Sequence, residues 1–160
     1  MSDPAIVSGN QAAPGKAQES QISWMVDAIV AALDADISKE LLVAKMPDKL
    51  QDFDLGQREG AILIHYRGSK YGPAAGGAQP REMTFDAHVL VRGLDGPFGA
   101  TVQVEGVRLS LQGRELQGGT AIALQSDGLV QEKDGIWNYV VTFTATLPAV
   151  ARRQPDWRPY

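Results

Sequence analysis

His65 and His88 are the only histidines in this chain of 160 residues. Both fall in segments whose side chains alternate between two faces as in strands, so they lie on neighbouring predicted strands, with Glu82 and Asp86 close in sequence. Imidazole and carboxylate groups are metal ligands, but a metal site needs three or four of them to converge. The spacing here indicates no such convergence. Ordinary strand histidines are therefore favoured, and we predict no metal and no cofactor.

Three other groups of residues bear on enzymatic chemistry. No serine lies in a Gly-x-Ser-x-Gly elbow. Asp52, Asp54 and Glu59 cluster in a polar stretch, where a solvated turn is favoured over acid–base catalysis. Residues 93–99, GLDGPFG, follow a predicted strand but match neither Gly-x-Gly-x-x-Gly nor a Walker motif, so they predict a strand-to-helix connection. We therefore predict no catalytic residue and no enzymatic activity.

A basic and aromatic group follows one of the predicted strands. Residues 60–72 are GAILIHYRGSKYG, in which Ile62, Ile64 and Tyr66 alternate with Ala61, Leu63 and His65. The strand is expected to end in a glycine-bracketed loop that holds Arg67, Lys70 and Tyr71. A second alternating run follows at residues 83–91, after the flexible composition of residues 72–80. We interpret the two runs as a hairpin whose tip contacts another protein.

The chain end forms a second basic and aromatic group. Pro148 is expected to end the last strand, and residues 149–160 are predicted to form an extended tail without a partner in the domain's own core. Its candidate contact residues are Arg152, Arg153, Trp157, Arg158 and Tyr160. These residue types are enriched at interface hot spots. The tail is either a solvated end or an extension that docks outside its own domain, and its aromatic residues favour docking.

Composition restricts the class of protein. The length predicts one domain, and the hydrophobic fraction of 44% is ordinary for a globular protein. A net charge of −4 provides no basic field for nucleic acid, and a three-residue basic loop would release few counterions. The absence of cysteine excludes disulfides and zinc–thiolate sites and fits a reducing cytosol. No apolar run is long enough to span a membrane, and no secretory signal is expected.

The first half of the chain predicts one clear helix. Residues 1–20 have the composition of a flexible arm. Residues 21–35 form an amphipathic helix with Ile22, Val26, Ile29 and Leu33 on its apolar stripe, and Ser20 is a plausible N-cap. Another helical turn is expected at residues 39–43, before a polar connection at residues 48–59. The main domain is therefore predicted to cover residues 21–148.

The second half is predicted to be mostly β. Residues 97–113 are ambiguous, because they alternate as in a strand but also form two apolar helical faces. One such face holds Phe98, Val102 and Leu109, and a helix of this kind needs two partners, such as a sheet and a neighbouring subunit. Residues 120–125 and 129–133 predict two short strands around a turn at residues 126–128. After the turn signal Asp134-Gly135, a long strand covers residues 137–147.

This ordered pattern resembles a known family. The helix at residues 22–33, the segment at 60–71, the strand REMTFDAHVLV at 81–91 and the closing strand at 137–147 carry the likeness. Together they are similar to the tail-terminator, or tail-completion, proteins of Mu-like phages and of contractile tailocins of the R-type pyocin kind. The likeness covers about residues 20–148.

The resemblance implies a fold and a function. The implied fold class is α+β, a mostly antiparallel sheet with helices packed on one face, in which residues 98–112 form a helix. Six copies are expected to form a ring that caps the head-proximal end of the tail tube, stops its growth and offers a docking surface. The implied partners are other copies and the tail tube protein, with sheath and neck or connector proteins as further candidates. The implied place is the virion or tailocin tail, assembled in the bacterial cytoplasm.

Two alternatives stay open from the sequence. One is a tube or baseplate component of a contractile tail. The other is a small ligand-binding or enzymatic α+β domain of unknown substrate.

Overall fold

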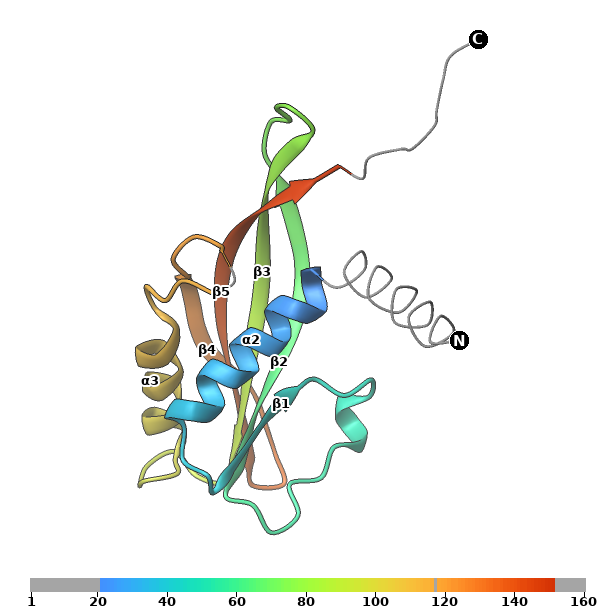
Figure 1. Ribbon diagram of the computed structural model, residues 1–160. Coiled ribbons are helices and arrows are strands. Elements are labelled where there is room, and N and C mark those ends of the chain that lie inside the picture. The colour runs from blue at the N-terminus through green and yellow to red at the C-terminus, as the bar shows by residue number, and fades with distance from the viewer. Residues whose placement is uncertain (1–20, 117, 152–160) are drawn as a thin grey trace, which may run out of the picture.

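A five-stranded sheet with helices on one face forms the centre of the molecule (Figure 1). The computed structural model describes residues 21–116 and 118–151. The elements in this part are α2 (Gln21–Asp36), β1 (Leu41–Lys45), the short 3₁₀ helix η1 (Leu50–Asp52), β2 (Gly60–Tyr71), β3 (Ala78–Val91), α3 (Ala100–Leu111), β4 (Ala123–Lys133) and β5 (Ile136–Val150). The strand order is β1-β2-β3-β5-β4. All neighbouring strands are antiparallel except β1 and β2. The predicted α+β class is confirmed.

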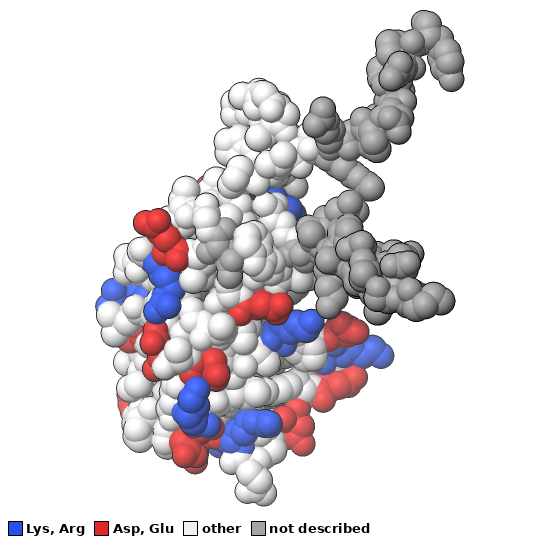
Figure 2. Space-filling view, viewed as in Figure 1, with Lys and Arg blue, Asp and Glu red and all other residues white. Residues whose placement is uncertain are grey.

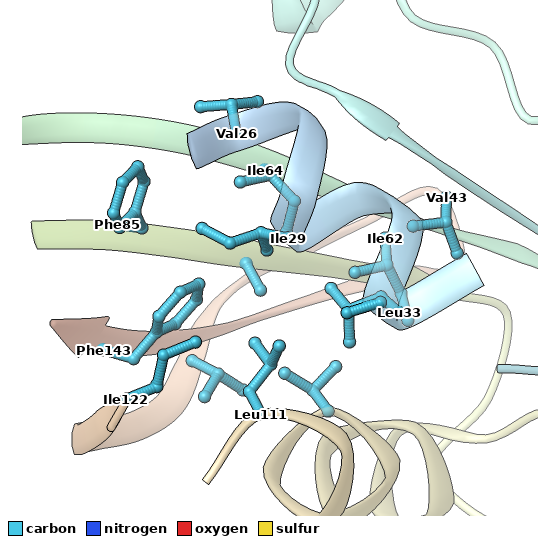
Figure 3. Close-up of a cluster of buried hydrophobic side chains, with 14 of the residues drawn as sticks. Val26, Ile29, Leu33, Val43, Ile62, Ile64, Phe85, Leu111, Ile122 and Phe143 are labelled. Carbon is cyan, nitrogen blue, oxygen red and sulfur yellow. The ribbon is translucent and has the colours of Figure 1, made fainter. Parts of the chain in front are cut away.

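Helix α2 packs its predicted stripe onto the sheet (Figure 3). Ile29 and Leu33 are fully buried, Val26 is buried and Ile22 is partly buried. Below them the rings of Phe85 and Phe143 stack with their centroids 5.7 Å apart. The alternating apolar residues of β2, β3 and β5 that face α2 join this main core, because side chains two apart on a strand point to the same face.

A smaller core covers one end of the opposite face. Ala61, Leu63 and Leu90 point away from α2 and are buried against Leu55. The connection between β1 and β2 supplies the cover, with partly buried side chains that include Phe53. The predicted alternation of β2 is therefore confirmed, with Ile62 and Ile64 in the main core and Ala61 and Leu63 in the smaller one.

Strand β1 corrects the predicted helical turn at residues 39–43. Leu41 and Val43 are buried in the main core, whereas Leu42 packs against the smaller core. A short apolar run with both faces covered is typical of a strand that lies between two layers. Its parallel pairing with β2, from Leu41 opposite Gly60, provides the hydrogen bonds that a helix would otherwise supply.

Helix α3 confirms the helix implied for residues 98–112. It begins after Gly99 and is followed by Gly113, whose φ of +78° suits the residue just beyond a helix end. Val107 and Leu111 are buried on the sheet. Val102 and Leu109 lie on the opposite face and are 49% and 69% exposed. The sheet therefore covers only one of the two predicted apolar faces.

The last third differs from the prediction in two places. Residues 126–128, predicted as a turn, lie within one continuous strand, β4, because all three pair with β5. The register of this pairing shifts at two bulges, near residues 125 and 130. Strand β5 also continues through Pro148, which lies opposite Pro80. Strand β4 pairs with β5 only between Ile136 and Thr144, so no strand lies beside Pro148 on the β4 side. Proline is tolerated at such a sheet edge because its missing N–H costs no ladder hydrogen bond. The turn at Asp134-Gly135 is confirmed.

Candidate functional site

The candidate site is an arm that extends beyond the helices at one end of the sheet (Figure 1). It consists of residues 67–81, which form the outer part of the β2–β3 hairpin, and residues 146–151 at the end of the last strand. Arg67, Lys70 and Tyr71 were expected in a loop, but β2 continues through Tyr71. The ladder with β3 keeps these residues in strand conformation, and only residues 72–77 connect the two strands.

A bulge at Arg67 changes which of the three predicted contact residues share a face of the strand. The register shifts between Tyr66 and Gly68, whose φ of +153° favours glycine. After the shift, Lys70 pairs with Glu82 on the face away from the helices. Arg67 and Lys70 line the same shallow polar hollow of about 340 Å³. The structure therefore brings these two cations together and separates them from Tyr71.

The cations of this hollow lie beside carboxylates. The Nε atom of Arg67 is 3.6 Å from Oδ2 of Asp86, and the side chain of Arg67 remains 54% exposed. The hydroxyl of Thr142 donates to Oδ1 of Asp86 at 2.6 Å. Because water reaches the Arg67 side of this pair and the two atoms are 3.6 Å apart, the contact contributes little to stability. Arg67 is therefore available to a partner surface at little cost to the fold.

Tyr71 lies on the helix side of the arm beside Arg81. The guanidinium carbon of Arg81 is 5.6 Å from the ring centroid of Tyr71 and 6.0 Å from that of Tyr66. The sequence reasoning did not single out Arg81. Its position in the sequence could have identified it, because Arg81 lies on the same strand face as the core residues Met83 and Phe85. A cation on a face that is turned toward the core needs hydrogen-bond partners.

Arg81 joins the arm to the body of the domain. Its three nitrogens donate to Oε1 of Gln21 at 2.9 Å, to Oγ of Ser69 at 2.9 Å and to the hydroxyl of Tyr66 at 3.2 Å. Gln21 in turn donates from Nε2 to the carbonyl oxygen of Pro148 at 3.1 Å. This Arg81 network connects the first turn of α2 with β2, β3 and β5, and so holds the arm at one angle to the domain.

The two histidines lie on adjacent strands, as predicted. Their ring centroids are 6.5 Å apart, and His65 is exposed. Burial lowers the pKa of His88, while the Asn138 side chain and the charge of Asp86 act in the opposite direction. Nδ1 of His88 and Oδ1 of Asn138 are both buried, and neither atom has a hydrogen-bond partner among the described residues.

The remaining chemical candidates have local structural roles. Within residues 21–116 and 118–151, no three side chains of the metal-binding types gather into a site. Oδ1 of Asp54 accepts from the backbone N–H of Gly56 at 2.9 Å, which is a turn contact. The connection at 93–99 leads into α3, where the N–H of Ala100 donates to the carbonyl of Gly93 at 2.9 Å. This confirms the predicted strand-to-helix connection. No helix of the same described part is long and apolar enough to cross a membrane.

Several predicted residues lie outside the described part of the chain. They are Ser20, the proposed N-cap, with the rest of residues 1–20, and the tail residues Arg152, Arg153, Trp157, Arg158 and Tyr160. The arm is thus the part of the predicted contact surface for which geometry is known.

Comparison with known proteins gives a family and a fold. No curated protein matches the sequence. A chain from the "Virion of native gene transfer agent (GTA) particle" has a similar fold, with a TM-score of 0.56 and 12% sequence identity. The likeness covers 82% of this chain and 99% of that one. The profile of the family described as "Gp37 protein" matches residues 29–160, which is most of the sequence. The chain therefore belongs to the Gp37 protein family.

Proposed function

We propose that this protein is a structural component of a phage-like tail and that it closes into a homohexameric ring at the head-proximal end of the tail tube. One observation carries the proposal: the fold matches almost the whole of a chain from a gene transfer agent virion. A domain of this kind therefore serves in such a particle with little else attached. Membership of the Gp37 protein family and the sequence resemblance to tail terminators support the same assignment.

The surface of the domain supports a head-to-tail ring. Such a ring needs two different surfaces on each copy, one of which fits the other on the next copy. The hairpin tip at residues 72–80 contains no charged residue, whereas side chains of both signs cover the lower half of the molecule in Figure 2. The outward residues Val102 and Leu109 of α3 add exposed apolar area on another element. The two ends of the domain therefore differ enough for directional assembly.

The mechanism of this proposal is geometric. A tail tube grows because each added ring presents the same face again. A terminator ring fits the tube protein on one face and presents a different surface on the other, so growth stops and neck, connector or sheath proteins can dock. The stabilisation comes from the area buried at each of six equivalent contacts, and closure leaves no contact unmade. The proposal requires no covalent chemistry, no nucleic-acid readout and no membrane.

Purification of the full chain provides the first test. Light scattering should give six times the 17.2 kDa mass of the chain, and negative-stain microscopy should display separate rings. Long tubes would instead favour the alternative of a tube component. Monomers at all concentrations would refute self-assembly.

Deletion of the protein from its particle tests the role itself. Without a terminator the tube has no stop, so tails should vary in length and often be too long. Tails of normal length that fail only to join a head would contradict termination and favour a neck role.

A further inference from the structure

An apolar groove runs along the arm on the side where β5 forms the sheet edge. Its volume is about 460 Å³, within the usual range for pockets that bind side chains or small ligands, roughly 300–1,000 Å³. The lining includes Pro73, Ala75 and Pro80 from the hairpin and Leu147 and Pro148 from β5. None of the lining residues is charged or aromatic. Small apolar side chains and proline rings therefore form a hollow that a large ring can fill.

The groove is part of the folded structure. Its far wall is the turn at residues 118–120, where the N–H of Thr120 donates to the carbonyl of Thr146 at 2.9 Å. The N–H of Thr146 donates back to Oγ1 of Thr120 at 3.2 Å. A Cβ atom on Gly119 would lie 2.9 Å from Cδ2 of Leu147 and 3.1 Å from the carbonyl oxygen of Thr146, so the wall approaches β5 closely at this glycine. The walls are thus fixed before any partner arrives.

The position of the chain end identifies an occupant. The N–H of Ala151 donates to the carbonyl of Gly77 at 2.6 Å, so the chain leaves the domain at the outer end of the arm. Nine residues, 152–160, follow and can span at most about 30 Å. Residues that precede proline avoid the helical region, so Gln154 and Arg158 favour extended backbone. A segment of this length is long enough to reach an adjacent copy.

The chemistry of these residues suits the groove and its surroundings. The nine residues carry three arginines and one aspartate, a net charge of +2, whereas the other 151 residues carry −6. Glu82 is paired with the lining residue Thr146, and Glu115 lies opposite Ala121, next to Thr120. Neither carboxylate forms a salt bridge among the described residues, although Lys70 lies opposite Glu82 in the ladder between β2 and β3. Trp157 supplies the large ring that the groove lacks.

We propose that residues 152–160 of one copy occupy the arm groove of a neighbouring copy, with Trp157 in the apolar hollow and arginines near Glu82 and Glu115. This inference rests on the proposed ring, because the ring places a second copy within reach. The match to the Gp37 protein family includes residues 152–160, which supports a role for them in the assembled protein. Aromatic anchors on extended, proline-containing segments commonly bind such grooves.

Disulfide trapping tests the contact directly, because the chain has no cysteine of its own. One full-length variant carries Ala75→Cys in the groove, and another carries Arg158→Cys in the tail. The two are mixed, oxidised gently and analysed by non-reducing electrophoresis and mass spectrometry. Ala74→Cys is the matched control, because Ala74 is an adjacent exposed alanine that does not line the groove.

A 75–158 disulfide between two chains, several times more abundant than the 74–158 disulfide, is the expected result. Adding Trp157→Ala should lower its yield about tenfold, as for loss of a hot-spot aromatic residue. Equal yields for positions 74 and 75 would overturn the proposal. So would a link that forms only within one chain of the Ala75→Cys/Arg158→Cys double variant. If light scattering still gives hexamers in either case, the inference fails while the proposed ring stands.

Discussion

Replacement of Arg81 by methionine tests whether the arm is held by one guanidinium. Methionine keeps the apolar stem, so the change removes mainly the hydrogen bonds to Gln21, Ser69 and Tyr66 and the contacts with two aromatic rings. A net contribution of about 1 kcal/mol per bond, reduced because the site is only partly buried, gives a loss of about 2 kcal/mol. For a chain of this size the melting temperature should fall by about 4–8 °C.

Two further variants separate the geometry of Arg81 from its charge. Arg81→Lys keeps the charge, but a single ammonium group cannot reach three acceptors on different elements, so about half of the loss should remain. Arg108→Met is the control, because Arg108 pairs only with the exposed side chains of Glu105 and Gln112 on the surface of α3. Its melting temperature should stay close to that of the unchanged protein.

Denaturant unfolding and hydrogen exchange provide the readouts. Backbone amides of residues 67–81 should exchange faster in Arg81→Met, while amides in the core of β3 and β5 should change little. The reasoning is refuted if Arg81→Met has the stability and exchange pattern of the original protein. It is also refuted if Arg81→Lys restores both completely, because charge alone would then account for the effect.

Three more predictions concern the core, the hollow on the outer face and pH. Ile29→Asp should unfold the domain, because an unpaired buried carboxylate costs several kcal/mol. Ala31→Asp, on the exposed side of α2, is the control and should melt at nearly the original temperature. Equal melting temperatures of the two variants by circular dichroism would contradict the assigned stripe. Arg67→Glu with Lys70→Glu should leave the melting temperature almost unchanged but reduce hexamer formation or tube capping, and normal hexamers with tails of normal length would place the interface elsewhere. Because the pKa of His88 is lowered in the folded state, the unfolded chain binds this proton more readily, so stability should fall as the pH drops below about 6.5. His88→Gln should reduce that fall, as measured by urea unfolding between pH 5 and pH 8, and an unchanged slope would show that another group is responsible.

Local periodicity determined much of this fold. The stripe Ile22, Val26, Ile29 and Leu33 repeats with the period of a helix, and all four residues pack against the main core. The alternation of residues 137–147 likewise places Phe143 and Leu147 on the buried face of β5. These predictions succeed because the period of side chains along an element is set by its own backbone geometry. Whatever partner it meets, an amphipathic segment buries the same face.

Other elements depended on partners that lie far away in sequence. Residues 41–45 form a strand because β2 lies alongside in parallel register, and no local pattern specifies that pairing. Local propensity favours a strand for residues 97–113, because valine is stiff at χ1 and Gly106 weakens a helix interior, and only the family resemblance implied a helix. In the structure that helix is stabilised by burial of Val107 and Leu111 on β3 and β5, which outweighs the weak local preference.

The candidate site shows the same division. The sequence by itself identified a basic and aromatic hairpin in an acidic chain, and its residue types were sufficient for that. Only the tertiary structure placed Arg67 and Lys70 in the same hollow, because a bulge at Arg67 changes the alternation that would otherwise put them on opposite faces. Only the tertiary structure showed the role of Arg81, whose hydrogen-bond partners are 12, 15 and 60 residues away along the chain. The sequence specifies the type of each side chain. Its hydrogen-bond partners depend on the fold, because distant segments must come within about 3 Å of it.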